Sequence, residues 1–167
     1  MTSVREEIAT CCKRLRLRRL TDHIDEVQAD DPEEFLLELL RTEVAHRDAA
    51  RIDRAIKTAG FYTPKYLKDF IFDEVTLPGN VSEQSLASLS FIEDRQNLIL
   101  YGNVGTGKTH LATALGIEAC KMRYKVQFWR TAALVNHLIR IHDGGDLQPF
   151  LKQIEKLDVL ICDEWGY

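Results

Sequence analysis

The stretch Gly102–Thr109 reads GNVGTGKT and matches the pattern G-x-x-x-x-G-K-[ST], which constrains the fold more than any other part of the sequence. It follows a short apolar run, Asn97–Tyr101, and opens an amphipathic segment that begins at Lys108. Glycines suit such a loop because they adopt backbone angles closed to other residues and let the chain approach a phosphate closely. Strand, loop and helix in this order therefore predict a phosphate-binding loop, in which backbone N–H groups and a helix N-terminus surround an anion.

The side chains of this loop have separate expected roles. Lys108 is expected to place a compact positive charge on the β- and γ-phosphates of a nucleotide, and the hydroxyl of Thr109 to bind Mg²⁺. His110 has a competing interpretation, because a histidine in a first helical turn is often packed or solvent-facing. The residues predicted to contact the nucleotide are Gly102, Asn103, Val104, Gly105, Thr106, Gly107, Lys108, Thr109 and His110.

A second motif, DVLICDE over 158–164, is an apolar segment that ends in two acids. A carboxylate at the C-terminal end of a strand faces the ligand crevice of an open α/β sheet. Asp163 is expected to hold Mg²⁺ through water, and Glu164 to act as general base on the water that attacks the γ-phosphate. The predicted catalytic residues are thus Glu164 and Lys108, and the predicted metal ligands are Thr109 and Asp163. A solvated pair of acids is the alternative.

The segments around these motifs alternate between two patterns. Apolar runs typical of buried parallel strands occupy 97–101, 125–129 and 159–162. Helical patterns separate and follow them, over 108–122, 131–142 and 147–157. This order predicts an α/β fold with a parallel sheet.

The first 60 residues lack the alternation of strands. Asp31-Pro32 is a good helix start, with Asp31 as cap, and that helix is expected to end near Gly60. A linker over 61–80 and a short helix over 82–91 complete the prediction.

Composition excludes several classes of protein. The chain has 167 residues and a net charge of −4, so bulk charge does not indicate a nucleic-acid partner. Its four cysteines have neither disulfide nor zinc spacing, and no apolar run is long enough to cross a membrane, so we expect a cytoplasmic protein. Basic side chains do cluster locally, and the alternative to DNA contact is a solvated helix face. The clustered residues are Lys13, Arg14, Arg16, Arg18, Arg19, Arg47, Arg51, Arg54, Lys57, Lys65 and Lys68.

Three segments, NLILYGNVGTGKTHLATALGIEAC, KVQFWRTAALVNHL and LDVLICDEWGY, closely resemble the IstB-type transposition helper ATPases, AAA+ proteins related to DnaC-type helicase loaders. The N-terminal segment EEFLLELLRTEVAHRDAARIDRAIKTAGF is also similar to this family. Departures are small: Asn103 and Val104 stand where the family usually has prolines, and Trp165 where it often has leucine.

The resemblance implies a P-loop NTPase of the AAA+ (ASCE) class that hydrolyses ATP, assembles as a homo-oligomer on DNA and assists a transposase. It implies an N-terminal helical region over 1–68, for DNA, partner or self-assembly contacts, and the first part of an ATPase core over 69–167. It also places Phe70 and Phe72 near the adenine, although core packing is the commoner role of such aromatics. Two alternatives stay open, a DnaC-type helicase loader and a nucleotide-binding remnant without catalysis.

Family members continue beyond the acidic strand with a sensor residue, an arginine finger and a strand that inserts beside the phosphate-loop strand. We therefore expect a parallel-sheet core that is incomplete at the C-terminus. Unpaired backbone groups and uncovered apolar faces would then make the protein marginally stable, prone to aggregate and poor at hydrolysis.

Overall fold

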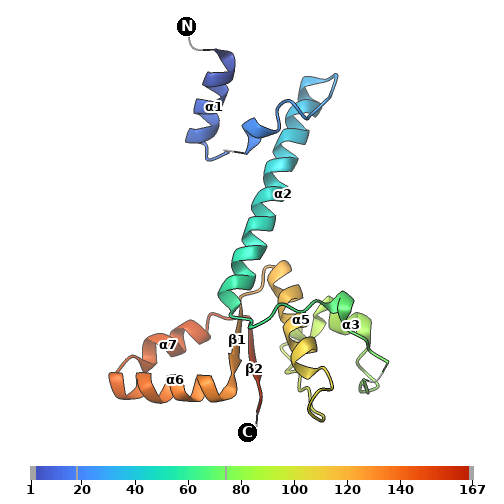
Figure 1. The fold of residues 1–167 in the computed structure, drawn as a ribbon, viewed down its shortest axis with the longest axis vertical. Helices are drawn as coiled ribbons and strands as arrows, with labels where there is room; N and C mark the ends of the chain where they lie inside the picture. The colour runs from blue at the N-terminus through green and yellow to red at the C-terminus, as the bar shows by residue number, and fades with distance from the viewer. Residues whose placement is uncertain (1–2, 18, 74, 166–167) are drawn as a thin grey trace. The chain divides into compact units, whose positions relative to one another are not determined.

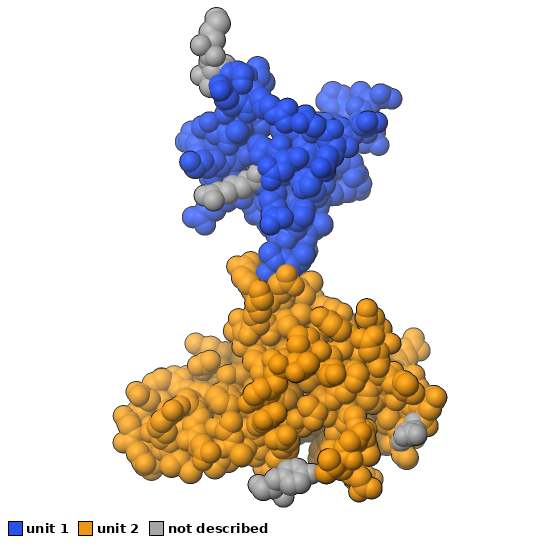
Figure 2. Space-filling view, in the orientation of Figure 1, with its two compact units in different colours: residues 1–51 blue, residues 52–167 orange. Residues whose placement is uncertain are grey.

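The computed structural model describes residues 3–17, 19–73 and 75–165, which form two compact units, residues 1–51 and residues 52–167 (Figure 2). The boundary predicted from the sequence, between residues 68 and 69, lies inside the second unit. That unit begins within a helix because Ala59 and Phe61 pack in its core. Within the described ranges, the helices are too short or too polar to span a lipid bilayer.

In the first unit, local capping explains where the helices begin. Helix α1 (Val4–Arg14) starts with a capping box, in which Ser3 and Glu6 each bond the other's backbone N–H. Helix α2 (Pro32–Ala59) starts after Asp31, whose Oδ2 accepts hydrogen bonds from the N–H groups of Glu33 and Glu34 at 3.1 and 3.0 Å. The predicted start of this helix is confirmed.

The core of the first unit is small and includes a buried charge. Among the described residues of this unit, the buried hydrophobic cluster consists of Cys12, Leu20 and Leu39. Glu43 is only 6% exposed, and its Oε1 accepts a hydrogen bond from Nε of Arg47 at 2.7 Å. A second guanidinium nitrogen of Arg47 donates to the carbonyl of Arg16. Arg47 thus has a structural role here, because a buried carboxylate without a partner is strongly destabilising.

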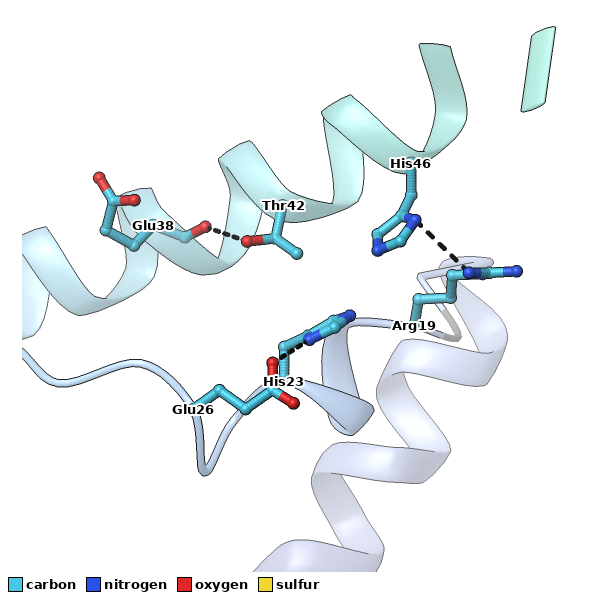
Figure 3. A network of polar contacts seen from close by, with 6 residues as sticks. All are labelled: Arg19, His23, Glu26, Glu38, Thr42 and His46. Carbon is cyan, nitrogen blue, oxygen red and sulfur yellow. Dashed lines mark hydrogen bonds and ion pairs between the residues drawn. The ribbon is translucent and has the colours of Figure 1, made fainter. Parts of the chain in front are cut away.

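A polar network lies beside this core (Figure 3). The rings of His23 and His46 stack with centroids 5.3 Å apart, and each ring has a further polar partner. Nη1 of Arg19 lies 3.4 Å from Nδ1 of His46, while Nδ1 of His23 contacts the carboxylate of Glu26. These contacts join the segment after α1 to α2.

Within the second unit, α2 ends before Gly60, whose φ of +83° stops the helix. A 3-10 turn, η2 (Leu67–Asp69), comes next. Two short helices, α3 (Glu83–Ser88) and α4 (Ser90–Glu93), stand where one helix was predicted over 82–91. The expected start at Ser82 is confirmed by its capping box, whereas Leu89, at φ 59°, breaks the helix in two. The remaining elements are α5 (Lys108–Lys121), β1 (Val126–Arg130), α6 (Thr131–Gly144), α7 (Leu147–Ile154) and β2 (Val159–Asp163).

Strands β1 and β2 pair in parallel, from Val126 opposite Val159 to Arg130 opposite Asp163. Figure 1 shows α5 on one side of this pair and α6 and α7 on the other. Helices α6 and α7 form the crossover connection that two parallel strands require. The predicted strands at 125–129 and 159–162 are confirmed. The strand predicted at 97–101 is wrong: in the described part of the chain this segment has no strand partner, and a strand exists only through its ladder.

Helix α5 is the centre of the second unit. It contacts both strands as well as α3 and η2. The approach to β2 is close at Gly116, where an added Cβ would lie 2.6 Å from Cδ1 of Ile161 and 2.8 Å from the ring of Phe61. This packing fixes the first turn of α5 relative to the end of β2. The buried hydrophobic residues of this core are Ala59, Leu86, Leu89, Leu111, Leu115, Ala119, Cys120 and Val126.

Candidate functional site

The loop between residue 101 and α5 has the backbone that its glycines predict. Gly102, Gly105 and Gly107 have φ values of +148°, +84° and +84°, which side chains rarely allow. Beside Gly105 the space is open, whereas an added Cβ at Gly107 would meet Cε2 of Phe70 at 3.0 Å. The loop therefore requires glycine for its dihedrals at these positions, and at Gly107 also for space.

The N-terminus of α5 faces this loop without a side-chain cap. Gly107 is the N-cap residue, and the first turn, which begins at Lys108, contains no acid. The first N–H groups of a helix have no partner within the helix, and the helix dipole makes this end positive. A 14-residue helix that starts in this way, after a loop of left-handed glycines, favours an anion.

The ammonium of Lys108 is held by the loop itself. Its Nζ donates to the carbonyl of Gly102 at 2.8 Å and to that of Asn103 at 2.6 Å. The hydroxyl of Thr106 donates to the same Asn103 carbonyl at 2.9 Å. Because an ammonium has three N–H donors, one remains for a ligand in the groove beside the loop.

Two residues 54 positions apart in the sequence meet at this loop. Oγ1 of Thr109 donates to Oδ2 of Asp163 at 2.8 Å, which joins the first turn of α5 to the end of β2. Hydroxyl and carboxylate oxygens are the hard ligands that Mg²⁺ prefers. The donor set at this point therefore fits Mg²⁺, and it consists of the two residues that the sequence proposed as metal ligands.

Glu164 follows β2 with a left-handed backbone, at φ 59°. Its Oε2 lies 3.6 Å from Nε of Arg130, and both side chains are about half exposed. The guanidinium carbon of Arg130 lies 4.2 Å from the ring centroid of Tyr62. Sequence reasoning did not identify Arg130 or Tyr62, although the parallel register, once known, puts Arg130 opposite Asp163.

A groove of about 1380 Å³ connects these groups. It runs between the 97–101 segment and β2, with α5 as its floor. Its volume exceeds the ~300–1,000 Å³ of typical ligand pockets, because the groove extends beyond the phosphate-binding loop along the whole 97–101 segment and β2. The predicted site residues that line the groove are Gly102, Val104, Gly105, Lys108, Thr109, Asp163 and Glu164.

The other predicted contacts do not line this groove. The carbonyl of Asn103 accepts hydrogen bonds from Lys108 and from the hydroxyl of Thr106. Gly107 is the N-cap residue of α5. The imidazole of His110 is turned elsewhere, with Nε2 3.2 Å from the carbonyl of Tyr66 and the ring 5.3 Å from that of Phe70. The side chain of His110 is thus packed against other parts of the unit, and only its backbone N–H is left to contact a nucleotide.

The two aromatic residues expected near the adenine, Phe70 and Phe72, are half-buried and pack against the main core. Their rings meet edge to face at 4.9 Å. Phe70 also covers Gly107. Core packing, the alternative interpretation, accounts for both side chains.

Comparison with known proteins places this geometry in a family. The family model described as IstB-like ATP binding protein matches residues 10–167. A relative from Geobacillus stearothermophilus, named as a candidate ATP-binding protein of insertion sequence IS5376, is 38% identical over 137 residues, which are 80% of this chain and 53% of the relative. The corresponding IS21 protein from Pseudomonas aeruginosa is 32% identical over 167 residues, 96% of this chain and 63% of the relative.

The chain spans about half the length of the first of these relatives and less than two thirds of the second. The family match nevertheless extends over 10–167, which includes the phosphate-binding loop and the acidic end of β2. We conclude that the chain belongs to the IstB-like family of ATP-binding proteins, which are P-loop NTPases with a helical N-terminal region.

Proposed function

We propose that this chain binds ATP with Mg²⁺ in the groove beside Gly102–Thr109 and serves as an ATP-dependent helper of DNA transposition. The observation that carries the proposal is the hydrogen bond from Thr109 to Asp163, formed next to the ammonium of Lys108. P-loop NTPases combine a loop lysine, a hydroxyl and an acid in this way around a triphosphate and Mg²⁺. The names of the relatives connect them with insertion sequences, which favours transposition over helicase loading.

Nucleotide binding is the first part of the proposal. The remaining N–H of Lys108 is expected to donate to the β- and γ-phosphates, and the first-turn amides of α5 to bond further phosphate oxygens. Both kinds of donor are already fixed, because the loop carbonyls hold the ammonium and the helix holds the amides. The phosphates thus meet donors that need little reorganisation.

Hydrolysis is the second part. Thr109 and Asp163 would hold Mg²⁺, which neutralises phosphate charge when it is bound. Glu164 is proposed to accept a proton from the attacking water, and its half-exposed carboxylate borders the groove, so water reaches it. A positioned general base of this kind contributes about 10²- to 10⁴-fold to a rate.

A titration with a fluorescent ATP analogue tests the nucleotide site. Lys108→Ala is expected to weaken binding at least about tenfold, because a charge-assisted contact with phosphate is lost. Thr109→Val and Asp163→Asn should reduce only the Mg²⁺-dependent part of the affinity. Lys152→Ala, an exposed lysine on α7, is the matched control and should change nothing. Unchanged affinity in Lys108→Ala would contradict the proposed site.

Turnover is tested separately, by comparing ATP hydrolysis in the unmodified chain and in Glu164→Gln. The substitution keeps the shape of the side chain but removes the base, so the rate should fall at least about a hundredfold while nucleotide affinity is kept. Equal rates in the two proteins would leave a nucleotide-binding protein without catalysis by Glu164.

Contact with DNA, self-assembly and a transposase partner belong to the same proposal and rest on family membership. The basic cluster around the end of α1 is the stronger candidate for DNA contact, because Lys13, Arg14 and Arg16 are exposed. In the other cluster, Arg47 is engaged by Glu43. Exposed cations of this kind bind phosphates in a salt-dependent, sequence-tolerant manner.

Replacing Lys13 and Arg14 with glutamate should therefore weaken DNA binding and lower the slope of log affinity against log salt by about one per lost phosphate contact. The same change in charge at Lys152 and Arg140, exposed residues of α7 and α6, is the control. An equal effect of both double substitutions would assign the binding to net charge rather than to the end of α1.

A further inference from the structure

A small pocket lies on the surface of the second unit, apart from the groove beside the phosphate-binding loop. It has a volume of about 280 Å³ and is lined by Tyr66, Lys68, Glu118 and Lys121. These four residues are all different from the residues that line the larger groove. The pocket is thus a separate feature, and its lining combines one aromatic ring with two ammonium groups and one carboxylate.

The backbone around Tyr66 is held in place from two sides. The carbonyl of Tyr66 accepts a hydrogen bond from the N–H of Asp69 at 3.1 Å, and it lies 3.2 Å from Nε2 of His110 in the first turn of α5. The next residue, Leu67, packs against the main core. Tyr66 nevertheless stays 39% exposed. Its ring is therefore presented at the surface by an ordered backbone, so little conformational freedom is lost when a ligand stacks on it.

Two lysines from different elements approach the ring of Tyr66. Nζ of Lys68, in η2, lies 5.9 Å from the ring centroid, and Nζ of Lys121, at the C-terminal end of α5, lies 5.8 Å from it. Both distances are at the outer limit of cation–π contacts, which is about 6 Å. The ring therefore engages these ammonium groups only weakly, and both lysines are exposed. The pocket thus places two positive charges beside one exposed aromatic ring.

Glu118 is the acid of this pocket, and it holds one of the two lysines. Its Oε1 accepts a hydrogen bond from Nζ of Lys121 at 2.6 Å. The side chains of the pair are 23% and 40% exposed, so solvent screens their attraction. Because an ammonium has three N–H donors, Lys121 can bind Glu118 and an anion at the same time. Glu118 thus keeps Lys121 beside the pocket, while its negative charge lowers the affinity of the pocket for an anion.

We propose that this pocket binds single-stranded DNA, with one base stacked on the ring of Tyr66 and the flanking phosphates on Lys68 and Lys121. Aromatic rings beside cations bind single strands with little regard to sequence, because every base has a π face. A base inside a duplex is already stacked between its neighbours, and an acidic peptide would match the charges without a planar group for the ring. The volume lies near the ~300 Å³ lower limit of ligand pockets, which suits one base. The choice of DNA rather than RNA rests on the proposed function in transposition.

Fluorescence anisotropy of a labelled oligo(dT), measured without ATP, tests the aromatic part of the site. Tyr66→Ala should weaken binding about 5- to 150-fold, the loss that corresponds to one stacked base, whereas Tyr66→Phe should keep the affinity. The matched control is Tyr62→Ala. Tyr62 is also exposed, and its ring lies 4.2 Å from the guanidinium carbon of Arg130, but it does not line the pocket, so this substitution should leave the affinity unchanged.

The charged part of the site is tested by the salt dependence of the same binding. Lys68→Ala and Lys121→Ala should each lower the slope of log affinity against log salt by about 0.7, the value for one phosphate of a single strand. Glu118→Gln should strengthen binding, because it removes the opposing charge, and Lys152→Ala on α7 is the control. Equal binding by Tyr66→Ala and the unmodified chain, or weaker binding by Glu118→Gln, would overturn the proposal. Displacement of the oligo(dT) by polyglutamate or by duplex DNA as readily as by unlabelled oligo(dT) would do the same.

Photocrosslinking separates this site from the basic end of α1 and from the nucleotide site. A strand that carries 5-iododeoxyuridine should crosslink to the peptide that contains Tyr66, in the unmodified chain and also in the Lys13→Glu, Arg14→Glu variant, as mass spectrometry would show. Lys108→Ala should keep this crosslink, so a failure of the proposed nucleotide site leaves the result unaffected. Crosslinks confined to the peptides of α1 would refute the pocket, and tighter binding of oligo(U) than of oligo(dT) would refute the choice of DNA.

Discussion

Alanine substitutions at three glycines separate backbone strain from steric contact in the phosphate-binding loop. Gly79 has neither a positive φ nor a neighbour within 4 Å of an added Cβ. Gly105 has a φ of +84° and open space, and Gly107 has the same φ with Cε2 of Phe70 at 3.0 Å. An added Cβ thus meets no obstacle at position 79, backbone strain alone at position 105, and backbone strain together with a steric contact at position 107.

The expected free energies follow from this series. Gly79→Ala should stabilise by up to about 0.4–1 kcal/mol, because the unfolded chain loses freedom. At Gly105 a left-handed alanine costs about 1–2 kcal/mol. The reduced freedom of the unfolded chain offsets part of this cost, as at Gly79, so we expect a net destabilisation of about 1 kcal/mol. Gly107→Ala adds overpacking of at least about 1 kcal/mol against the half-buried Phe70, which gives about 2 kcal/mol or more in total.

Urea unfolding, monitored by circular dichroism, measures these differences in stability. Affinity for the fluorescent ATP analogue reports whether the loop still binds nucleotide. Phe70→Leu should recover the steric part of the loss in Gly107→Ala and leave Gly105→Ala unchanged. If Gly105→Ala and Gly107→Ala are as stable as Gly79→Ala and bind the analogue normally, the loop does not depend on left-handed glycines and this reasoning is wrong.

Three further predictions concern packing, thiol reactivity and acid stability. Leu89→Ala should cost about 2–5 kcal/mol in urea unfolding, since this side chain is fully buried, and a loss below about 1 kcal/mol would contradict its core position. Burial raises the pKa of the Cys162 thiol, so iodoacetamide should alkylate exposed Cys11 first and reach Cys162 only as the pH rises, as peptide mass spectrometry would show. The hydrogen bond from Arg5 lowers the pKa of Asp25. The stability that this pair contributes is therefore present above the ordinary aspartate pKa and is lost as the pH falls through the lowered value. Arg5→Ala should abolish that part of the acid sensitivity in thermal unfolding followed by circular dichroism.

The phosphate-binding loop and its helix were predictable because their signals are local. Three glycines, a lysine and a run of helix-forming residues determine dihedrals and a helix start without reference to the rest of the chain. The cap at Asp31 and the end of α2 before Gly60 are local in the same sense. The apolar character of β2 and its terminal acids likewise predicted where Asp163 would lie.

What the sequence could not supply depends on contacts between distant residues. The 97–101 run is as apolar as a strand, but strand formation depends on a hydrogen-bonded neighbour, which no local pattern encodes. Arg47 looked like part of a cationic stripe until Glu43 proved to be buried beside it. The pairing of Arg130 with Glu164 required the register of β1 and β2, which hydrophobic runs do not fix.

The anchoring of Lys108 explains which positions of the loop tolerate sequence drift. Its ammonium is oriented by the main-chain carbonyls of residues 102 and 103, and a carbonyl is present whatever side chain a residue carries. The side chains at positions 103 and 104 can therefore change while the positive charge stays in place. Selection on this loop should act on the path of the backbone, and so on the glycines, more strongly than on the side chains between them.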